Sequence, residues 1–342
     1  MDLARFPRRK YLEAPTPLHA LPHFSKALGG PNIYIKRDDL LPGTEGGNKT
    51  RKLEFVVGDA IEKGADTLIT CGAIQSNHCR LTLSAAIKEG LSCRLVLEER
   101  VKGSYNADAN GNNFLYKLLG VEHITVVAGG SDLAACMQKE ADEVAQAGRT
   151  PYLIPGGASN AIGALGYVNC AQELQAQLLE QEIVLDHIIV PSGSSGTHAG
   201  MVTGLQGTNT DIPVSGICVS REKTKQEALV FSLVEQTAEK LGLSQTIPRQ
   251  TVECFDAYVG EGYSIPTEGM VEAIKLLAQT EGILLDPVYS GKTMAGLIDL
   301  IRKGHFKKGQ NVLFLHTGGA PALYAYLDTF NPTFDTSITN TL

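Results

Sequence analysis

The chain has 342 residues, of which 43% are hydrophobic and 20% charged, a composition typical of a globular protein with two domains or one large one. Its net charge of −7 and pI near 5.7 argue against a surface that binds nucleic acid. No apolar run approaches the roughly 18 residues that span a bilayer, and the basic start lacks the apolar segment of a secretory signal, so we expect no membrane partner and a cytoplasmic location.

Short β-branched runs alternate along the chain with helical patterns. The strand-like runs lie at 32–36, 67–70, 93–98, 123–128, 151–155, 187–191, 214–220 and 311–317. The apolar residues from Leu53 to Ile61 recur at helical spacing, which predicts a helix there, and another helix is expected from about Asn77. This alternation predicts an α/β fold with parallel-rich sheets covered by helices.

Two glycine-rich breaks, at 43–48 and 155–166, divide the chain. We predict a small α/β domain over 48–159, inserted into a large domain made of 1–47 and 160–342. Ligands of such sheets bind at the carboxyl ends of the strands, so the active-site cleft should lie between the two domains.

Residues 43–50, GTEGGNKT, come close to a nucleotide-binding P-loop, although Asn48 replaces its last glycine. One hypothesis is therefore a nucleotide-binding protein. The other is that Lys49 carries different chemistry, because the positive end of a helix dipole disfavours a cation and lowers the pKa of the amine. We interpret the neighbouring Arg51 and Lys52 as part of a solvated helix face.

A second candidate for a phosphate site is PSGSSGTHAG at 191–200, directly after the strand-like run. Its glycines and hydroxyls would present N–H and O–H donors at a helix N-terminus, where a dianionic phosphate is stabilised. An ordinary turn that caps a helix is the alternative. If this loop binds phosphate, Lys49 need not do so.

The stretch CGAIQSNHCR at 71–80 is again a strand, a small-residue loop and a helix start. Ser76 and Asn77 are good N-cap residues, so one interpretation is that this loop only caps the helix that follows. The functional alternative is that the N–H groups and side chains of 75–78 bind a substrate carboxylate. Cysteines and histidines show no C-x-x-C or H-x-x-x-H spacing, so we predict reduced thiols and no metal site.

Together these loops resemble the tryptophan-synthase-β-like enzymes of fold type II, which use pyridoxal 5′-phosphate. The resemblance is greatest to the family of 1-aminocyclopropane-1-carboxylate deaminase and D-cysteine desulfhydrase. The motifs that carry it include IKRDD at 35–39, GGNKTRKLEF at 46–55, GAIQSNH at 72–78, SGSSGTHAG at 192–200, DPVYSGK at 286–292 and HTGGAPALY at 316–324. It implies a two-domain fold whose large domain binds the cofactor, and a homodimer.

The resemblance also implies roles for individual residues. Lys49 would bind the cofactor covalently, Asn77 would hydrogen-bond its phenolate oxygen, and Thr317 would lie near its pyridine nitrogen. The cofactor phosphate would be held by Gly193, Ser194, Ser195, Gly196 and Thr197. The small amino-acid substrate would contact Gln75, Ser76, Asn77 and His78. The residues expected to act in catalysis are Lys49, Ser76, Tyr263 and Tyr289.

The implied activity is β-elimination from a cysteine-like amino acid, with D-cysteine giving pyruvate, ammonia and hydrogen sulfide. Ring-opening deaminases of this family carry Glu where this chain has Ser290, so 1-aminocyclopropane-1-carboxylate deamination is the weaker prediction. The L-cysteate sulfo-lyases share nearly all these motifs and release sulfite, and they are the alternative. A sulfonate needs a nearby cation or donors, for which Arg80 and His198 are candidates.

Overall fold

The computed structural model describes residues 1–108 and 110–330. The strands of its larger sheet are β1 (Leu18–Ala20), β2 (Asn32–Arg37), β7 (His187–Ser192), β8 (Val214–Cys218), β9 (Val252–Phe255) and β10 (Asn311–His316). Their spatial order is β1-β2-β10-β7-β8-β9. Neighbouring strands are parallel except β1, which pairs antiparallel with β2.

The smaller sheet is parallel throughout. Its strands are β3 (Thr67–Ala73), β4 (Ser92–Glu99), β5 (His123–Ala128) and β6 (Pro151–Ile154), in the order β5-β4-β3-β6. Every strand predicted from the sequence is confirmed. Most of them are buried on both faces, and such strands read as continuous apolar runs, whereas β5 and β6 are only partly covered. β1 and β9 were not predicted, since three and four residues are too few to show a pattern.

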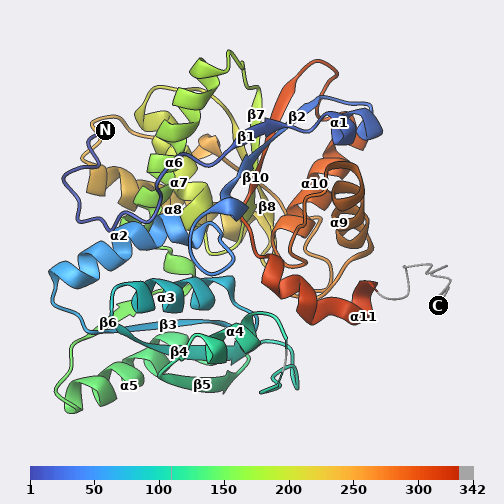
Figure 1. Cartoon of the computed structure of the whole chain (residues 1–342). Coiled ribbons are helices and arrows are strands. Elements are labelled where there is room, and N and C mark those ends of the chain that lie inside the picture. Colours follow the sequence, from blue (N-terminus) through green and yellow to red (C-terminus); the bar gives the residue numbers. More distant parts are fainter. Residues whose placement is uncertain (109, 331–342) are drawn as a thin grey trace.

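Helices cover both sheets (Figure 1). They are α1 (Pro22–Leu28), α2 (Lys49–Glu62), α3 (Asn77–Lys88), α4 (Asn112–Leu118), α5 (Leu133–Gln146), α6 (Ala161–Glu180), α7 (Gly196–Gly207), α8 (Lys223–Leu241), α9 (Glu268–Glu281), α10 (Ser290–Arg302) and α11 (Leu327–Phe330). The predicted starts of α2 and α3 are confirmed. Among the described residues, none of these helices is long and apolar enough to cross a bilayer.

The smaller sheet is built entirely from residues 67–154, whereas the larger one uses strands before residue 38 and after residue 186. In Figure 1 the two sheets form separate halves of the molecule, with α2 and α3 at their junction. This arrangement is compatible with an inserted small domain. The boundaries at 48 and 159 stay a prediction.

Helix α2 is buried on nearly all sides. Its apolar residues pack into the core under the smaller sheet, while Phe55 packs against α6. The backbones of α2 and α6 approach so closely that a Cβ on Gly166 would lie 2.3 Å from the Arg51 carbonyl oxygen. The interpretation of Arg51 and Lys52 as a solvated face is therefore wrong, because each is only 1% exposed.

Arg51 is held by two carboxylates, the fully buried Asp38 and the largely buried Glu173. Its Nε and Nη2 donate to Asp38 Oδ2 and Oδ1, both at 2.9 Å, and its Nη1 donates to Glu173 Oε2 at 2.8 Å. Lys36 Nζ donates to Glu173, and the Tyr167 hydroxyl donates to Asp38 at 2.7 Å. These contacts join the end of β2, the first turn of α2 and the middle of α6.

Replacing Asp38 with alanine should strongly destabilise the protein. The change leaves the Arg51 guanidinium buried without its main acceptor, and removing one partner of such a pair costs about 3–5 kcal/mol of unfolding free energy. Glu272→Ala is the control, because Glu272 and Arg302 form an exposed pair worth less than about 1 kcal/mol. Urea unfolding of both variants measures the difference, and equal losses would contradict the prediction.

The contribution of Asp38 should also depend on pH. Burial alone would raise the pKa of its carboxyl, but Arg51 and Lys36 lower the pKa below its ordinary value. A carboxyl with a depressed pKa in the folded state stabilises at neutral pH and loses that contribution as the pH falls. The difference in unfolding free energy between wild type and Asp38→Ala should therefore become smaller as the pH is lowered.

Candidate active site

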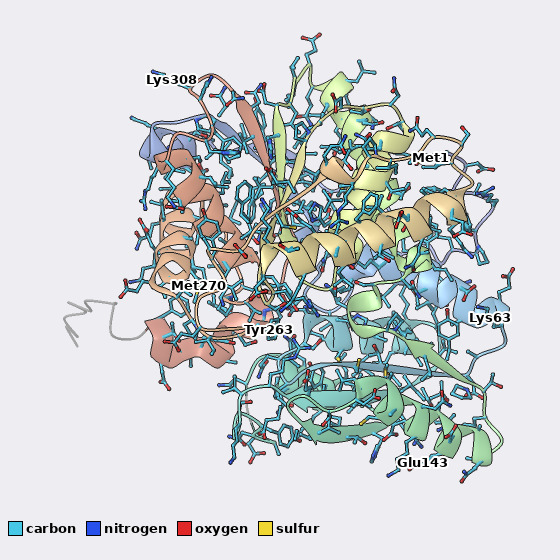
Figure 2. The ribbon with its side chains drawn as sticks, turned by 180° about the vertical axis from the view of Figure 1, so that it is seen from behind. Met1, Lys63, Glu143, Tyr263, Met270 and Lys308 are labelled. Atoms are coloured by element: carbon cyan, nitrogen blue, oxygen red, sulfur yellow. The ribbon has the colours of Figure 1, made fainter. Side chains whose placement is uncertain are left out.

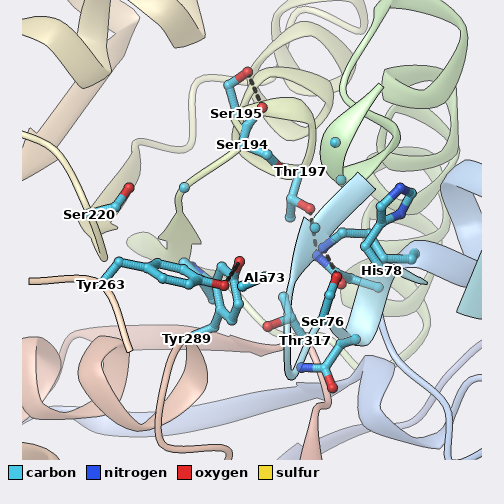
Figure 3. A pocket seen from close by; sticks show the side chains of 18 of the residues that line it. Ala73, Ser76, His78, Ser194, Ser195, Thr197, Ser220, Tyr263, Tyr289 and Thr317 are labelled. Atoms are coloured by element: carbon cyan, nitrogen blue, oxygen red, sulfur yellow. Dashed lines mark hydrogen bonds between the residues drawn. The ribbon is translucent and has the colours of Figure 1, made fainter. Parts of the chain in front are cut away.

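A cavity of about 460 Å³ lies where the carboxyl ends of strands from both sheets meet (Figure 3). Its wall includes the starts of α2 and α3, the loop between β7 and α7, and the residues that follow β8 and β10. Tyr263, which also lines it, lies at the junction of the two halves (Figure 2). A cavity of this size suits a cofactor or a small ligand.

The predicted site residues converge on this cavity. Those that line it are Lys49, Ser76, Asn77, His78, Gly193, Ser194, Ser195, Thr197, Tyr263, Tyr289 and Thr317. Gln75 does not, because its side chain binds the Asn110 carbonyl and the Asn112 N–H at the start of α4. Gly196 lies behind the wall, where a Cβ would come within 2.8 Å of Lys52 Nζ.

Lys49 is the first residue of α2, and its side chain reaches the cavity with little exposure to solvent. Its Nζ donates to Asn48 Oδ1 at 3.0 Å and lies 5.7 Å from the centre of the Tyr289 ring. The pKa of the ammonium is lowered to about 8: burial is the largest cause, the charge of Asp286 opposes it, and the charge of Arg80 adds to it. The direction agrees with the prediction, but burial is the largest cause.

The loop between β7 and α7 has the geometry of an anion cradle. Ser195, which precedes the first helical residue, has a φ of +78°, a left-handed conformation that is uncommon outside glycine. A Cβ on Gly193 would lie 3.2 Å from Tyr289 Cε1, so a side chain there would crowd the cavity. The Thr197 hydroxyl accepts a hydrogen bond from Asn48 Nδ2 at 2.9 Å.

The loop is supported from behind by residues outside it. The Ser159 hydroxyl donates to Ser194 Oγ at 2.8 Å and accepts from the Gly196 N–H at 3.2 Å. Lys52 Nζ donates to the Gly157 carbonyl at 3.1 Å, and burial lowers its pKa well below the ordinary value. Lys52 therefore supports the cradle from inside the protein, a role that the sequence did not show.

The near P-loop at 43–50 cannot serve as a second cradle, because its groups are already used. The Asn48 N–H donates to the Thr317 carbonyl and the Thr50 N–H to the Gly47 carbonyl, both at 3.0 Å. The Thr50 hydroxyl, which would bind Mg²⁺ in a P-loop, donates to the Pro42 carbonyl. The nucleotide-binding alternative has no support in this geometry.

Two tyrosines form one wall of the cavity. The hydroxyls of Tyr263 and Tyr289 lie 2.8 Å apart and their rings meet edge to face (Figure 3). Beneath them Asp286, fully buried, accepts hydrogen bonds from the N–H groups of Val288, Tyr289 and Ser290. Asp286 thus fixes the backbone that carries Tyr289, although the sequence showed only its proximity to that tyrosine.

The loop before α3 serves structure and site together. Ser76 Oγ accepts from the Cys79 N–H at 3.1 Å and so caps α3, as the structural interpretation predicts, while Ser76 also lines the cavity. The Asn77 amide oxygen accepts from Asn112 Nδ2 at 2.8 Å. His78 Nε2 lies 2.7 Å from the Thr70 hydroxyl, and burial lowers the pKa of its imidazole well below the usual range, so the ring is neutral.

Three charged residues of the cavity were missed. Glu98 and Arg100 come from the end of β4, and Arg221 follows β8. The two cations proposed from the sequence do not line it: Arg80 Nε binds Asn112 Oδ1, and His198 is buried beside β8. Their positions after strands could have identified Arg100 and Arg221, because the same rule drew attention to the loops at 71–80 and 191–200.

The comparison with protein families agrees with this site. The family described as "Pyridoxal-phosphate dependent enzyme" matches residues 10–318. The chain belongs to this family.

Similar proteins cover nearly the whole chain. The chain is 47% identical over 325 residues to a D-cysteine desulfhydrase of Salmonella typhimurium. The matched region covers 95% of this chain and 97% of the desulfhydrase. The solved structure of an ACC deaminase homologue matches with a TM-score of 0.87 and 38% identity, over 96% and 97% of the two chains. A fungal L-serine ammonia-lyase from Rhizomucor miehei, 21% identical with a TM-score of 0.66 over 94% and 98%, shows the shared fold alone.

The cavity fits the cofactor of this family. Backbone and hydroxyl donors at the N-terminus of α7 suit a dianionic phosphate. On the same cavity wall lies the Lys49 amine, whose lowered pKa favours the neutral, nucleophilic form. The individual roles of Asn77 and Thr317 stay predictions.

Lys49 should be the residue that binds the cofactor covalently. Borohydride reduction of the holoenzyme followed by peptide mapping should place the label on Lys49. Lys52 is the internal control, since it is also buried, lies three residues away and donates to the Gly157 carbonyl behind the phosphate loop. Capture of cofactor by the cofactor-free protein should accelerate as the pH rises and level off above about 8. Label on Lys52, Lys36 or Lys292 would contradict the assignment.

Thr197→Val should weaken cofactor retention. A hydrogen bond to a charged group contributes about 1.5–3 kcal/mol, so the dissociation constant should rise roughly ten- to a hundredfold. Thr197→Ser keeps the hydroxyl and should bind nearly as well as wild type. Equilibrium dialysis against pyridoxal phosphate measures all three proteins, and equal retention by the valine variant would show that the loop is misassigned.

Proposed function

We propose that this protein is a pyridoxal-phosphate-dependent lyase that converts D-cysteine and water into pyruvate, ammonia and hydrogen sulfide. The observation that carries the proposal is the 47% identity to a D-cysteine desulfhydrase over nearly the full length of both chains. The site supports it, because most of the residues expected to hold cofactor and substrate, all but Gln75 and Gly196, line one cavity.

The chain's own residues can supply each proton transfer. The cofactor, when bound, acts as an electron sink for the substrate's α-carbon. The Lys49 amine would take the α-proton, since a pKa lowered to about 8 makes its neutral form accessible near neutral pH. The donors at the start of α3 suit the substrate carboxylate. Burial raises the pKa of Tyr263 and Tyr289, so both phenols are protonated and can donate to the departing sulfur.

Ring opening of 1-aminocyclopropane-1-carboxylate has less support. The Ser290 hydroxyl donates to Asp286 Oδ1 at 2.7 Å and does not line the cavity. Glu98 is the carboxylate that does line it, and Arg100 neutralises it at 2.6 Å. Among the residues that the structure describes, the cavity therefore offers no free carboxylate in place of the glutamate that the ring-opening enzymes carry.

L-Cysteate is the second candidate substrate. Its elimination releases sulfite, and a sulfonate needs cations or donors beside the β-carbon. Arg100 and Arg221 both line the cavity and meet that requirement better than Arg80 and His198, which do not line it. The homodimer and the cytoplasmic location, which rest on resemblance and on the sequence, are part of this proposal.

A panel of four substrates tests the proposal. Purified holoenzyme is incubated with D-cysteine, L-cysteine, L-cysteate and 1-aminocyclopropane-1-carboxylate while keto acid, sulfide and sulfite are measured. We expect equal amounts of pyruvate and sulfide, fastest from D-cysteine, and negligible 2-oxobutyrate. Sulfite without sulfide would transfer the assignment to L-cysteate, and abundant 2-oxobutyrate would overturn the argument from Ser290.

A further inference from the structure

We propose that Arg100 is a specificity-determining residue whose guanidinium binds the β-substituent of the substrate and favours one that carries negative charge, such as a sulfonate or a thiolate. This inference rests on the proposed β-elimination. Arg100 would discriminate among cysteine-like substrates by the charge of their leaving group.

Arg100 is held firmly at the edge of the cavity. It directly follows β4, at the carboxyl end of the smaller sheet. Its Nε donates to Glu98 Oε2 at 2.6 Å, and its Cζ lies 4.4 Å from the centre of the Tyr263 ring. An ion pair on one side and an aromatic ring on the other restrict the guanidinium, so little conformational entropy is lost when it binds a ligand.

The remaining donors of Arg100 are available. Across residues 1–108 and 110–330, neither of its terminal nitrogens has a hydrogen-bond partner, and 35% of the side chain is exposed. Those nitrogens carry four of the five N–H donors of a guanidinium, in the fork geometry that matches the paired oxygens of an oxyanion. Arg100 therefore offers an oxyanion a preformed site within the cavity.

The location of Arg100 points to the substrate's side chain. Lys49 Nζ lies 5.7 Å from the Tyr289 ring centre, the Tyr289 and Tyr263 ring centres are 5.8 Å apart, and Arg100 Cζ lies 4.4 Å from the Tyr263 ring centre. The two tyrosines thus connect Lys49 to Arg100 along one wall of the cavity. A substrate whose α-carbon is near Lys49 can extend its β-substituent along this tyrosine wall towards Arg100.

The other anionic groups have their own sites. The substrate carboxylate is provided for at the start of α3 and the phosphate at the start of α7. Arg221 also lines the cavity, but its Nη1 donates to the Gly193 carbonyl at 2.9 Å, which ties this guanidinium to the phosphate loop. Arg100 makes no hydrogen bond to that loop and has both terminal nitrogens without a partner among the described residues, so we assign the leaving group to Arg100.

Glu98 limits the size of the effect. Its Oε1 accepts from the Gly130 N–H at 2.9 Å and its Oε2 from Arg100, so the carboxylate anchors the guanidinium and neutralises the pair. Attraction therefore comes from directed hydrogen bonds rather than from net charge. Because charged hydrogen bonds contribute about 1.5–3 kcal/mol, we expect a discrimination of about tenfold or somewhat more.

Two unreactive ligands test the inference through binding alone. 3-Sulfopropanoate and 3-mercaptopropanoate lack the amino group, and at pH 7 the first carries an anionic β-substituent while the second carries a neutral thiol. Calorimetry on the holoenzyme should show that Arg100→Gln weakens 3-sulfopropanoate about tenfold and 3-mercaptopropanoate less than about twofold. Arg100→Lys, which keeps the charge but not the fork, should fall between.

The matched control is Arg94→Gln. Arg94 lies on β4, the strand that Arg100 follows, but it pairs with Glu122 and Glu140 outside the cavity. Its replacement should therefore leave the ratio of the two affinities unchanged. If Arg100→Gln weakens both ligands equally, Arg100 only positions Tyr263, and the inference is overturned. An unchanged 3-sulfopropanoate affinity overturns it as well.

Turnover separates this inference from the proposed function. If Arg100→Gln leaves the ratio of the two ligand affinities unchanged while wild type still makes pyruvate from D-cysteine, the inference fails and the proposed function stands. If wild type makes no keto acid from any cysteine-like substrate, the proposed function fails, whatever the binding ratio. When both hold, Arg100→Gln should lower kcat/KM for L-cysteate more than for D-cysteine.

Discussion

The burial of Arg51 between Asp38 and Glu173 is the constraint on which the site depends. Arg51 lies two residues after Lys49, so the contact that anchors its guanidinium also fixes the first turn of α2. A buried ion pair need not add net stability, because desolvation offsets much of its attraction. What it does provide is one defined geometry, and the position of the Lys49 amine follows from it.

Three side chains from the first turn of α2 lie in three different surroundings. Lys49 faces the cavity, Arg51 faces the ion network, and Lys52 supports the phosphate loop through the Gly157 carbonyl. A solvated helix would leave these side chains free to change rotamer. Here the packing of α2 against α3 on one side and α6 on the other removes that freedom, so the amine and the phosphate cradle keep a fixed separation.

The sequence predicted the strands and two of the loops that line the cavity for one physical reason, whereas the tyrosines and Thr317 were expected from the family resemblance alone. Parallel strands covered on both faces are continuously apolar, and ligand-binding loops follow their carboxyl ends. The burial of Arg51 could not be seen, because its partners are 13 and 122 residues away and periodicity describes only local patterns. Asp286 was missed similarly: its hydrogen bonds to backbone N–H groups depend on a turn whose shape no residue pattern specifies.

The choice of leaving group depends on side chains rather than on the fold, since one fold can host many reactions. A poor leaving group needs a strong proton donor at the β-carbon, whereas hydrogen sulfide and sulfite leave with little or no help. The wall beside the β-carbon holds two phenols whose pKa values are raised by burial, and a guanidinium that stays protonated. Such weak acids assist sulfur elimination adequately but would protonate a hydroxyl leaving group slowly. The wall therefore favours sulfur substrates before any contact with the sulfur itself is considered.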